Sequence, residues 1–159
     1  MRISTHGSGR RSAKTGFVLI TLAASMFMLL AVIGLAFDLG RVYIAHNETQ
    51  IFADAAAMAA ARELDGTDAG IARARAAIHR LPVRWNLGTQ PFGQVRCDFS
   101  ADSRRWETAP RESTQIRFVR VQALDERLPI VFLAAVGGPH EFAAPAAAVA
   151  SSKPVRLIE

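Results

Sequence analysis

The longest apolar run of the chain lies close to its N-terminus. Between Phe17 and Phe37 no residue is charged, and only Thr21 and Ser25 are polar. At about 1.5 Å of helix rise per residue, this run reaches roughly 30 Å, the thickness of a bilayer's hydrocarbon core. The pattern therefore predicts one transmembrane helix over residues 17–37.

A cleaved signal peptide is the alternative interpretation of this run. The apolar core of a signal peptide usually has about 7–15 residues and is followed by a small-x-small cleavage site. Here the run is longer, and it ends in Phe37-Asp38-Leu39-Gly40-Arg41, which lacks that pattern. A retained membrane anchor is favoured.

The helical pattern continues beyond the predicted span, because the following segment is rich in alanine and no proline occurs before Pro82. His46, Gln50 and Asp54 recur every four residues and mark a polar edge. An apolar stripe opposes that edge: Ile44, Ala45, Ile51, Phe52, Ala55, Met58 and Ala59. We expect a membrane-proximal helix over residues 38–65 that packs this apolar face against another surface and stops at Asp65-Gly66.

A second, shorter helix is expected next, capped by Thr67 or Asp68 and closed by Pro82. Its buried stripe is made of Ile71, Ala74, Ile78 and Leu81.

Further along, the period of the apolar positions changes from helical to two. Val95, Cys97 and Phe99 alternate with Arg96 and Asp98, as in a half-buried strand whose two charged residues face water. Residues 104–108 are a candidate returning strand of a hairpin. The β-branched and aromatic run over residues 115–123 predicts the central strand of a sheet.

Near the C-terminus, the apolar segment 128–136 is too short to cross a bilayer and is expected to be a buried helix. Residues 142–150 suit a final strand, at a sheet edge because Pro145 cannot donate a ladder hydrogen bond. The predicted fold is α+β: a long helix followed by one domain over residues 66–150 with a small antiparallel sheet, and a tail over 151–159.

The charges indicate the orientation in the membrane. The net charge is +5, yet residues 1–16 hold four basic side chains and no acidic one, leaving 15 basic against 14 acidic side chains in the remainder. Basic residues beside a span favour the cytoplasm, so residues 1–16 are expected to be a disordered cytoplasmic tail and the domain to be exported. The nearly neutral remainder gives no support for nucleic-acid binding.

No group of residues in the sequence has the pattern of a metal or catalytic site. The histidines are scattered: His6, His46, His79 and His140. There is no G-x-S-x-G motif and no phosphate-binding glycine loop, so neither an enzyme, a cofactor nor a small-molecule substrate is predicted. The single cysteine, Cys97, excludes an internal disulfide; a buried thiol is favoured over a covalent dimer.

Asp38 is the first charged residue after the apolar run. An acid in hydrocarbon is costly, so Asp38 is expected to mark the outer boundary, with Arg41 one turn later as its partner. Tyr43 would lie at interface depth, where its amphipathic ring is favoured. These residues either set the depth of the helix, or Asp38 pairs with a basic group of a partner helix.

Two short motifs carry a resemblance to a known family. They are Asp38-Leu39-Gly40-Arg41-Val42-Tyr43 and the segment from Gln50 to Ala59, in which Asp54 precedes three alanines. Together with the basic tail, Gly16 and the span, they resemble the N-terminal region of the Tad pilus-assembly family, the TadE/TadG-like proteins. The resemblance covers residues 16–64, about a third of the chain.

The resemblance implies a pilin-like, single-pass protein of the bacterial inner membrane with a periplasmic domain. It also makes Asp38, Gly40, Arg41, Tyr43, Gln50 and Asp54 candidates for helix depth and assembly. Prepilin-type members are cut after a glycine and carry Glu at the fifth mature position. A cut between Gly16 and Phe17 would put Thr21 there instead.

The predicted function is a non-enzymatic component of a Tad (Flp-type) pilus or secretion assembly, either a minor pilin-like subunit or an assembly protein. Its partners would be membrane lipid and other assembly subunits, bound through helix packing. A tethered periplasmic binding or adhesion module is the alternative. An assembly subunit should leave part of the stripe around Ile44, Phe52 and Met58 exposed, whereas a tethered module should bury all of it.

Overall fold

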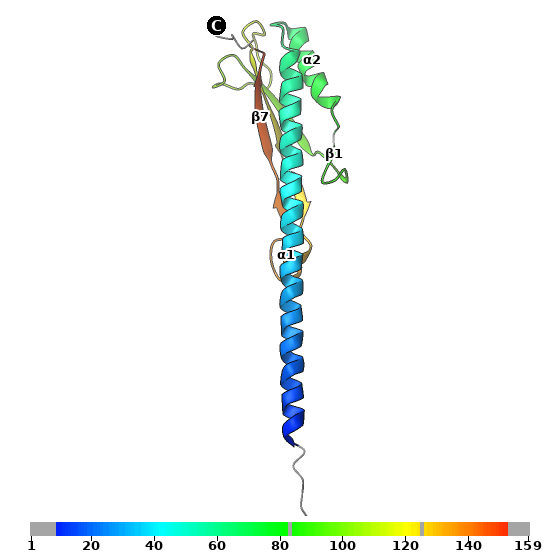
Figure 1. Ribbon diagram of the computed structural model, residues 1–159. Coiled ribbons are helices and arrows are strands. Elements are labelled where there is room, and N and C mark those ends of the chain that lie inside the picture. Colours follow the sequence, from blue (N-terminus) through cyan, green and yellow to red (C-terminus); the bar gives the residue numbers. More distant parts are fainter. Residues whose placement is uncertain (1–8, 83, 125, 153–159) are drawn as a thin grey trace, which may run out of the picture.

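The computed structural model describes residues 9–82, 84–124 and 126–152, so half of the predicted cytoplasmic tail and most of the tail over 151–159 lie outside it. One helix, α1 (Gly9–Arg62), forms the axis of the molecule, and a small domain lies along its C-terminal half (Figure 1). Its 54 residues correspond to about 80 Å of helix rise. The predicted continuous helix is confirmed, although it begins at Gly9, within the segment expected to be disordered.

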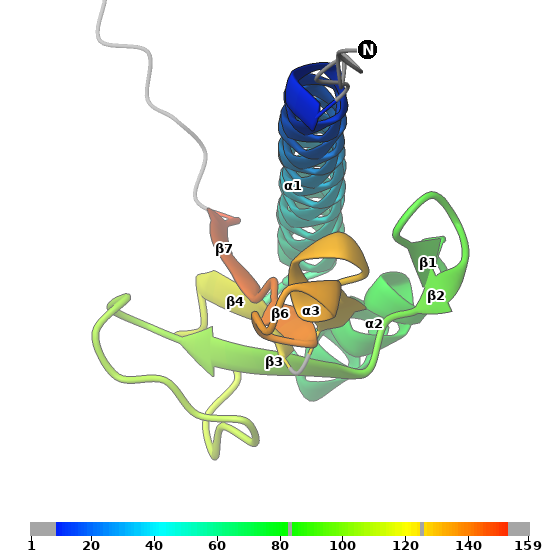
Figure 2. The same cartoon turned by 90° about the horizontal axis from the view of Figure 1, so that it is seen from below.

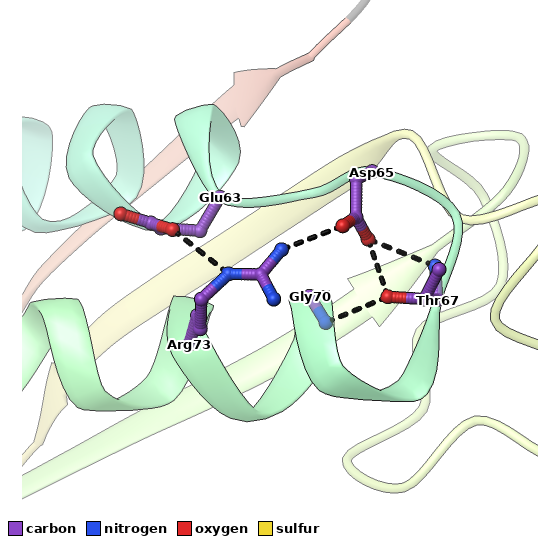
Figure 3. Close-up of polar contacts among 5 residues, drawn as sticks. All are labelled: Glu63, Asp65, Thr67, Gly70 and Arg73. Carbon is purple, nitrogen blue, oxygen red and sulfur yellow. Dashed lines mark hydrogen bonds and ion pairs between the residues drawn. The ribbon is translucent and has the colours of Figure 1, made fainter.

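The turn after α1 is held by a network of side chains around Asp65 (Figure 3). α2 (Asp68–His79) is capped by Thr67, whose Oγ1 accepts a hydrogen bond from the Gly70 N–H at 3.0 Å. Asp65 in turn accepts hydrogen bonds from the Thr67 N–H and hydroxyl. Arg73 forms ion pairs with Glu63 at 3.2 Å and with Asp65 at 2.6 Å. The predicted stop and cap are confirmed.

The main sheet is antiparallel and has the order β3-β4-β7. Its strands are β3 (Gln94–Ser100), β4 (Phe118–Leu124) and β7 (Ala146–Ser151). The central position of β4 confirms the predicted central strand, and β7 is an edge. The predicted single strand over residues 142–150 is wrong, because residues 141–143 belong to another sheet and Pro145 separates them from β7. Val119 pairs with Phe99 on one side and Ala150 on the other.

Small side chains bring α1 close to this sheet. The buried face of α1 is made largely of alanines: Ala45, Ala53, Ala56, Ala57, Ala60 and Ala61. On β7, Ala146 and Ala148 are buried, and β7 lies along α1 (Figure 1). Because no long side chain separates the two backbones, helix and sheet can approach closely.

Aromatic rings extend the core beside α1. The ring of Phe52 stacks on Phe92 with centroids 4.1 Å apart, and Trp85 lies beyond Phe92 at 6.3 Å. Trp85 belongs to β1 (Arg84–Trp85) and Phe92 follows β2 (Gln90–Pro91), and these two strands pair as a short ribbon that the sequence analysis did not predict.

The predicted strand over residues 104–108 is wrong. Only Glu107 pairs with β3, through two backbone hydrogen bonds to Phe99. The strand that follows β3 in the sheet is β4, and residues 101–117 form the long connection between them.

The predicted buried helix over residues 128–136 is also wrong. Leu128 is buried in a strand, β5 (Arg127–Pro129), which pairs with β6 (Glu141–Ala143). Only α3 (Phe132–Ala135) is helical, and none of its residues is buried. Some apolar residues of this segment lie in a buried strand and others in a loop outside the core. A short apolar run alone does not distinguish these two environments.

Candidate functional site

Asp38 connects the apolar part of α1 to the loop between β5 and β6. Its side chain is only 3% exposed. Its two carboxylate oxygens accept hydrogen bonds from the backbone N–H groups of Val131 at 3.3 Å, Phe132 at 2.8 Å and Leu133 at 2.7 Å. Asp38 thus caps the loop at the start of α3, which lies beside α1 (Figure 2).

The expected partner of Asp38, Arg41, has a different contact. Its Nη1 donates a hydrogen bond to the backbone carbonyl of Pro129 at 3.1 Å. The prediction of an Asp38–Arg41 side-chain pair is therefore corrected: both side chains bind backbone groups of the β5–β6 region. Sequence spacing identified the right residues, but it could not reveal a backbone partner about 90 positions away.

The same loop packs on a glycine that the sequence analysis did not single out. A Cβ atom at Gly34 would lie 2.7 Å from Cβ, Cγ and Cδ1 of Phe132, a distance that real side chains do not tolerate. The ring of Phe132 also meets that of Phe37 edge to face, with centroids 5.6 Å apart. A glycine within a span is the available signal for such a close approach.

The other candidates of the first motif are open to the surroundings. Nothing lies within 4 Å of a Cβ atom built on Gly40, and Tyr43 is largely exposed. Gly16 is equally open, and Phe17 beside it is exposed. The proposed processing bond is therefore not covered by the domain.

Gln50 and Asp54 of the second motif lie one turn apart on α1. Gln50 Nε2 donates to Asp54 Oδ1 at 3.0 Å and to the backbone carbonyl of Ala147 at 3.4 Å. Gln50 therefore links α1 to the edge strand β7, while the carboxylate of Asp54 stays exposed beside it.

Several large apolar side chains of α1 remain outside the core beyond the predicted span, and three of them recur at a regular spacing. Ile44, Ile51 and Met58 are 40%, 67% and 52% exposed. They are spaced by seven residues, so they lie on one side of the helix. We call them the exposed stripe. The predicted apolar stripe is therefore divided, because Phe52 and the smaller alanines form the buried face, whereas Ile44, Ile51 and Met58 stay exposed.

One buried carboxylate, that of Asp98, lies with its hydrogen-bond donors on the outer face of the sheet, and the sequence analysis missed it. Asp98 is fully buried and accepts hydrogen bonds from Arg120 at 2.8 Å, Thr108 at 2.8 Å and Arg96 at 3.0 Å. Burial alone would raise the pKa of Asp98, but these hydrogen bonds hold it below its ordinary value. Alternation predicted an exposed Asp98; the connection 101–117, with Trp106 stacked on Arg120, covers that face instead.

Cys97 lines an open groove between α2 and β3. The groove has a volume of about 650 Å³, and its lining includes Arg75, His79 and Arg96. Burial raises the pKa of the Cys97 thiol to about 12, so the thiol stays protonated and is a poor nucleophile. Within residues 9–82, 84–124 and 126–152, no three His, Cys, Asp or Glu side chains are grouped as metal ligands.

α1 is the one helix among the described residues that is long and apolar enough to cross a membrane. Neither the curated proteins nor the solved structures contain a match to this chain. A family model does match: residues 16–63, from the glycine before the span almost to the end of α1, correspond to the Tad family of putative Flp pilus-assembly TadE/G-like proteins, as the two motifs predicted.

Proposed function

We propose that this chain is a non-enzymatic, membrane-anchored subunit of a Tad (Flp-type) pilus or secretion assembly. α1 would cross the inner membrane once, with its N-terminus in the cytoplasm and the α+β domain in the periplasm. The family match over residues 16–63 supports a role in pilus assembly. The finer role, as a minor pilin-like subunit or an assembly protein, is inferred from the shape and surface of α1.

The exposed stripe is the observation that carries the proposal. The domain buries the alanine face of α1, yet Ile44, Ile51 and Met58 stay open on the same helix. A heptad spacing is the pattern with which one helix packs against another. Phe37 extends the spacing into the span and is also largely exposed. One continuous helical surface is thus available to a partner subunit, both inside and outside the bilayer.

The polar groups of the domain support a structural role. Asp38 binds three backbone amides, Asp98 is enclosed by three side-chain donors, and Cys97 carries a thiol with a raised pKa. The two carboxylates are engaged in holding the fold, and none of the three groups has the arrangement of a nucleophile beside a base.

The proposal is tested by complementing a deletion strain with the full-length chain carrying Ile51→Arg. Arginine on an exposed helical position leaves the fold intact but places a charge in an apolar helix contact. We expect piliation or secretion to be lost while the protein level stays that of the wild type. Ala72→Arg, at an exposed position of α2, is the matched control and should complement fully.

Full complementation by Ile51→Arg and by Met58→Arg would contradict the proposal, because a subunit that assembles through α1 cannot carry charges on that surface. Orientation is tested separately by protease protection in spheroplasts, in which the domain should be digested from outside. N-terminal sequencing of the purified protein tests processing, since a cut after Gly16 would expose Phe17.

The tethered binding or adhesion module remains the second candidate, because the groove beside Cys97 offers it a surface. Arg75 and Arg96 line that groove together with apolar side chains. If Arg75→Glu abolished adhesion while Ile51→Arg had no effect, the tethered module would replace the assembly subunit as the better function.

A further inference from the structure

The loop between β5 and β6 is unusually apolar for a segment outside the core. From Val131 to Pro139 it contains no charged residue. Val131, Phe132 and Val136 are 54%, 46% and 60% exposed. Adjacent large apolar side chains of this kind, gathered on one loop, are costly to leave in water and mark a contact with something apolar.

The position of this loop identifies what it contacts. Phe132 packs on Gly34, and a shallow apolar hollow separates the loop from the helix. The hollow is lined by Met28, Ala31, Val32 and Leu35 of α1 and by Phe132, Leu133 and Val136 of the loop. All four residues of α1 lie within the apolar run 17–37. Met28 is ten residues before Asp38, or about 15 Å along the helix axis. A bilayer that surrounds the run must therefore also meet the loop.

Backbone N–H groups at both ends of the loop have hydrogen-bond partners within the protein, as a position in the membrane requires. Irregular backbone is tolerated at membrane depth only where its polar groups are satisfied by protein. The N–H groups of Val131, Phe132 and Leu133 are bound by the buried carboxylate of Asp38. At the other end, the N–H groups of Val136, Gly137 and Gly138 bind carbonyls of Leu133 and Ala134.

Within the β5–β6 segment itself, charged side chains are confined to the base of the loop. Arg127 pairs with Glu141 across β5 and β6 at 3.3 Å, and both side chains are well exposed. Arg41 reaches the carbonyl of Pro129 from the helix. The side chains of the β5–β6 segment thus change from charged in the strands to apolar in α3. The side chains of α1 change from polar to apolar over the same stretch.

We propose that the β5–β6 loop is inserted into the outer leaflet of the membrane beside α1, with lipid acyl chains covering Val131, Phe132 and Val136. The domain then contacts the bilayer at two points, the helix and the loop, instead of being tethered by the helix alone. This inference rests on the membrane anchoring of the proposed function.

The test is nitroxide labelling of single cysteines in the full-length protein, reconstituted in vesicles of phosphatidylethanolamine and phosphatidylglycerol. In a Cys97→Ser background, labels are placed by Val136→Cys in the loop, by Ile20→Cys in the span and by Val149→Cys on the exposed side of β7. Collision with oxygen reports lipid, and collision with a water-soluble nickel chelate reports water. We expect the label at position 136 to resemble that at position 20 and to differ from that at position 149.

The labels at positions 136, 20 and 149 distinguish the ways in which the proposal could be overturned. Lipid at position 20 with water at position 136 would overturn the loop insertion alone. Water at all three positions would remove the membrane anchoring and the loop insertion together. Shielding of position 136 from both oxygen and nickel would mean that protein covers the loop, which also overturns the proposal. Unchanged unfolding temperatures of the labelled variants control for disturbed folding.

Discussion

The side chain of Phe132 occupies the space that any side chain at Gly34 would require. Three of its carbon atoms lie 2.7 Å from the position of a Cβ atom at residue 34. This contact joins the apolar part of α1 to a loop almost 100 residues later in the chain. It fixes the domain at one height and one rotation on the helix.

Gly34→Ala should therefore destabilise the β5–β6 loop. The contact includes Cβ of Phe132, so the backbone of the loop must move, and overpacking of this kind costs about 1–3 kcal/mol. Thermal unfolding in detergent micelles should show the loss, at about 4–8 °C per kcal/mol for a domain of this size. Gly40→Ala is the matched control, since its Cβ would meet nothing within 4 Å. Equal unfolding temperatures for the two variants would refute the contact.

Asp38→Ala should loosen the same loop from the other side. The substitution leaves three backbone N–H groups without their acceptor, and each buried donor left unpaired costs about 1–3 kcal/mol. Asp38→Asn keeps a carbonyl oxygen as acceptor, so its loop should be more stable than that of Asp38→Ala and less stable than that of the wild type. Hydrogen exchange of the amides of residues 131–133 measures the effect directly. Unchanged protection in Asp38→Ala would show that the carboxylate is not their acceptor.

Asp98→Ala should be among the most damaging single substitutions in the domain. It removes the buried partner of Arg120 and Arg96, whose side chains are 27% and 53% exposed, so the cost should lie below the value of about 3–5 kcal/mol for breaking a fully buried ion pair. Glu141→Ala breaks the exposed pair with Arg127 and should cost at most about 1 kcal/mol. Denaturant unfolding of both variants checks the ranking, which would be wrong if the two midpoints agreed.

The turn after α1 should lose stability in acid. Hydrogen bonds from Thr67 and Arg73 lower the pKa of Asp65 to about 2 from an ordinary value of 3.8. A carboxylate with a lowered folded-state pKa stabilises the fold above its unfolded pKa, and this contribution disappears as the pH falls from about 4 to about 2. Asp65→Asn should thus unfold at a lower temperature than the wild type near neutral pH. The difference should vanish near pH 2, and a difference independent of pH would contradict this origin.

Cys97 should react slowly with maleimides at about pH 8. A pKa raised to about 12 from 9.0 leaves about a thousandfold less thiolate, the reactive form. The rate should rise sharply when the domain is unfolded by denaturant. A cysteine introduced by Val149→Cys in a Cys97→Ser background is the exposed reference. Equal rates in the folded protein would show that the thiol at position 97 is not shielded.

Elements with a local signal could be predicted from the sequence. The continuity of α1, the stop before Gly66, the cap at Thr67 and the strand β4 each depend on residues close together in the chain. The α+β class follows from them. The motifs of the N-terminal third also identified the family that residues 16–63 match.

The predictions that were wrong concern residues whose surroundings depend on contacts between distant segments. Asp98 alternates like a solvent-facing residue, and only the connection 101–117 buries it. Leu128 and Phe132 belong to one apolar run, yet the first lies in the core and the second on Gly34. Asp38 was recognised as a boundary residue, but its partners are backbone amides, which have no sequence signature.

A single helix from Gly9 to Arg62 has no joint at which movement could be absorbed. A shift of its N-terminal end by one turn, about 5.4 Å along the axis, would move its C-terminal end by the same distance. A rotation of the N-terminal end would carry the sheet around the helix axis. The helix is therefore one continuous rod, through which a displacement at its N-terminal end would be passed on to the domain at its other end.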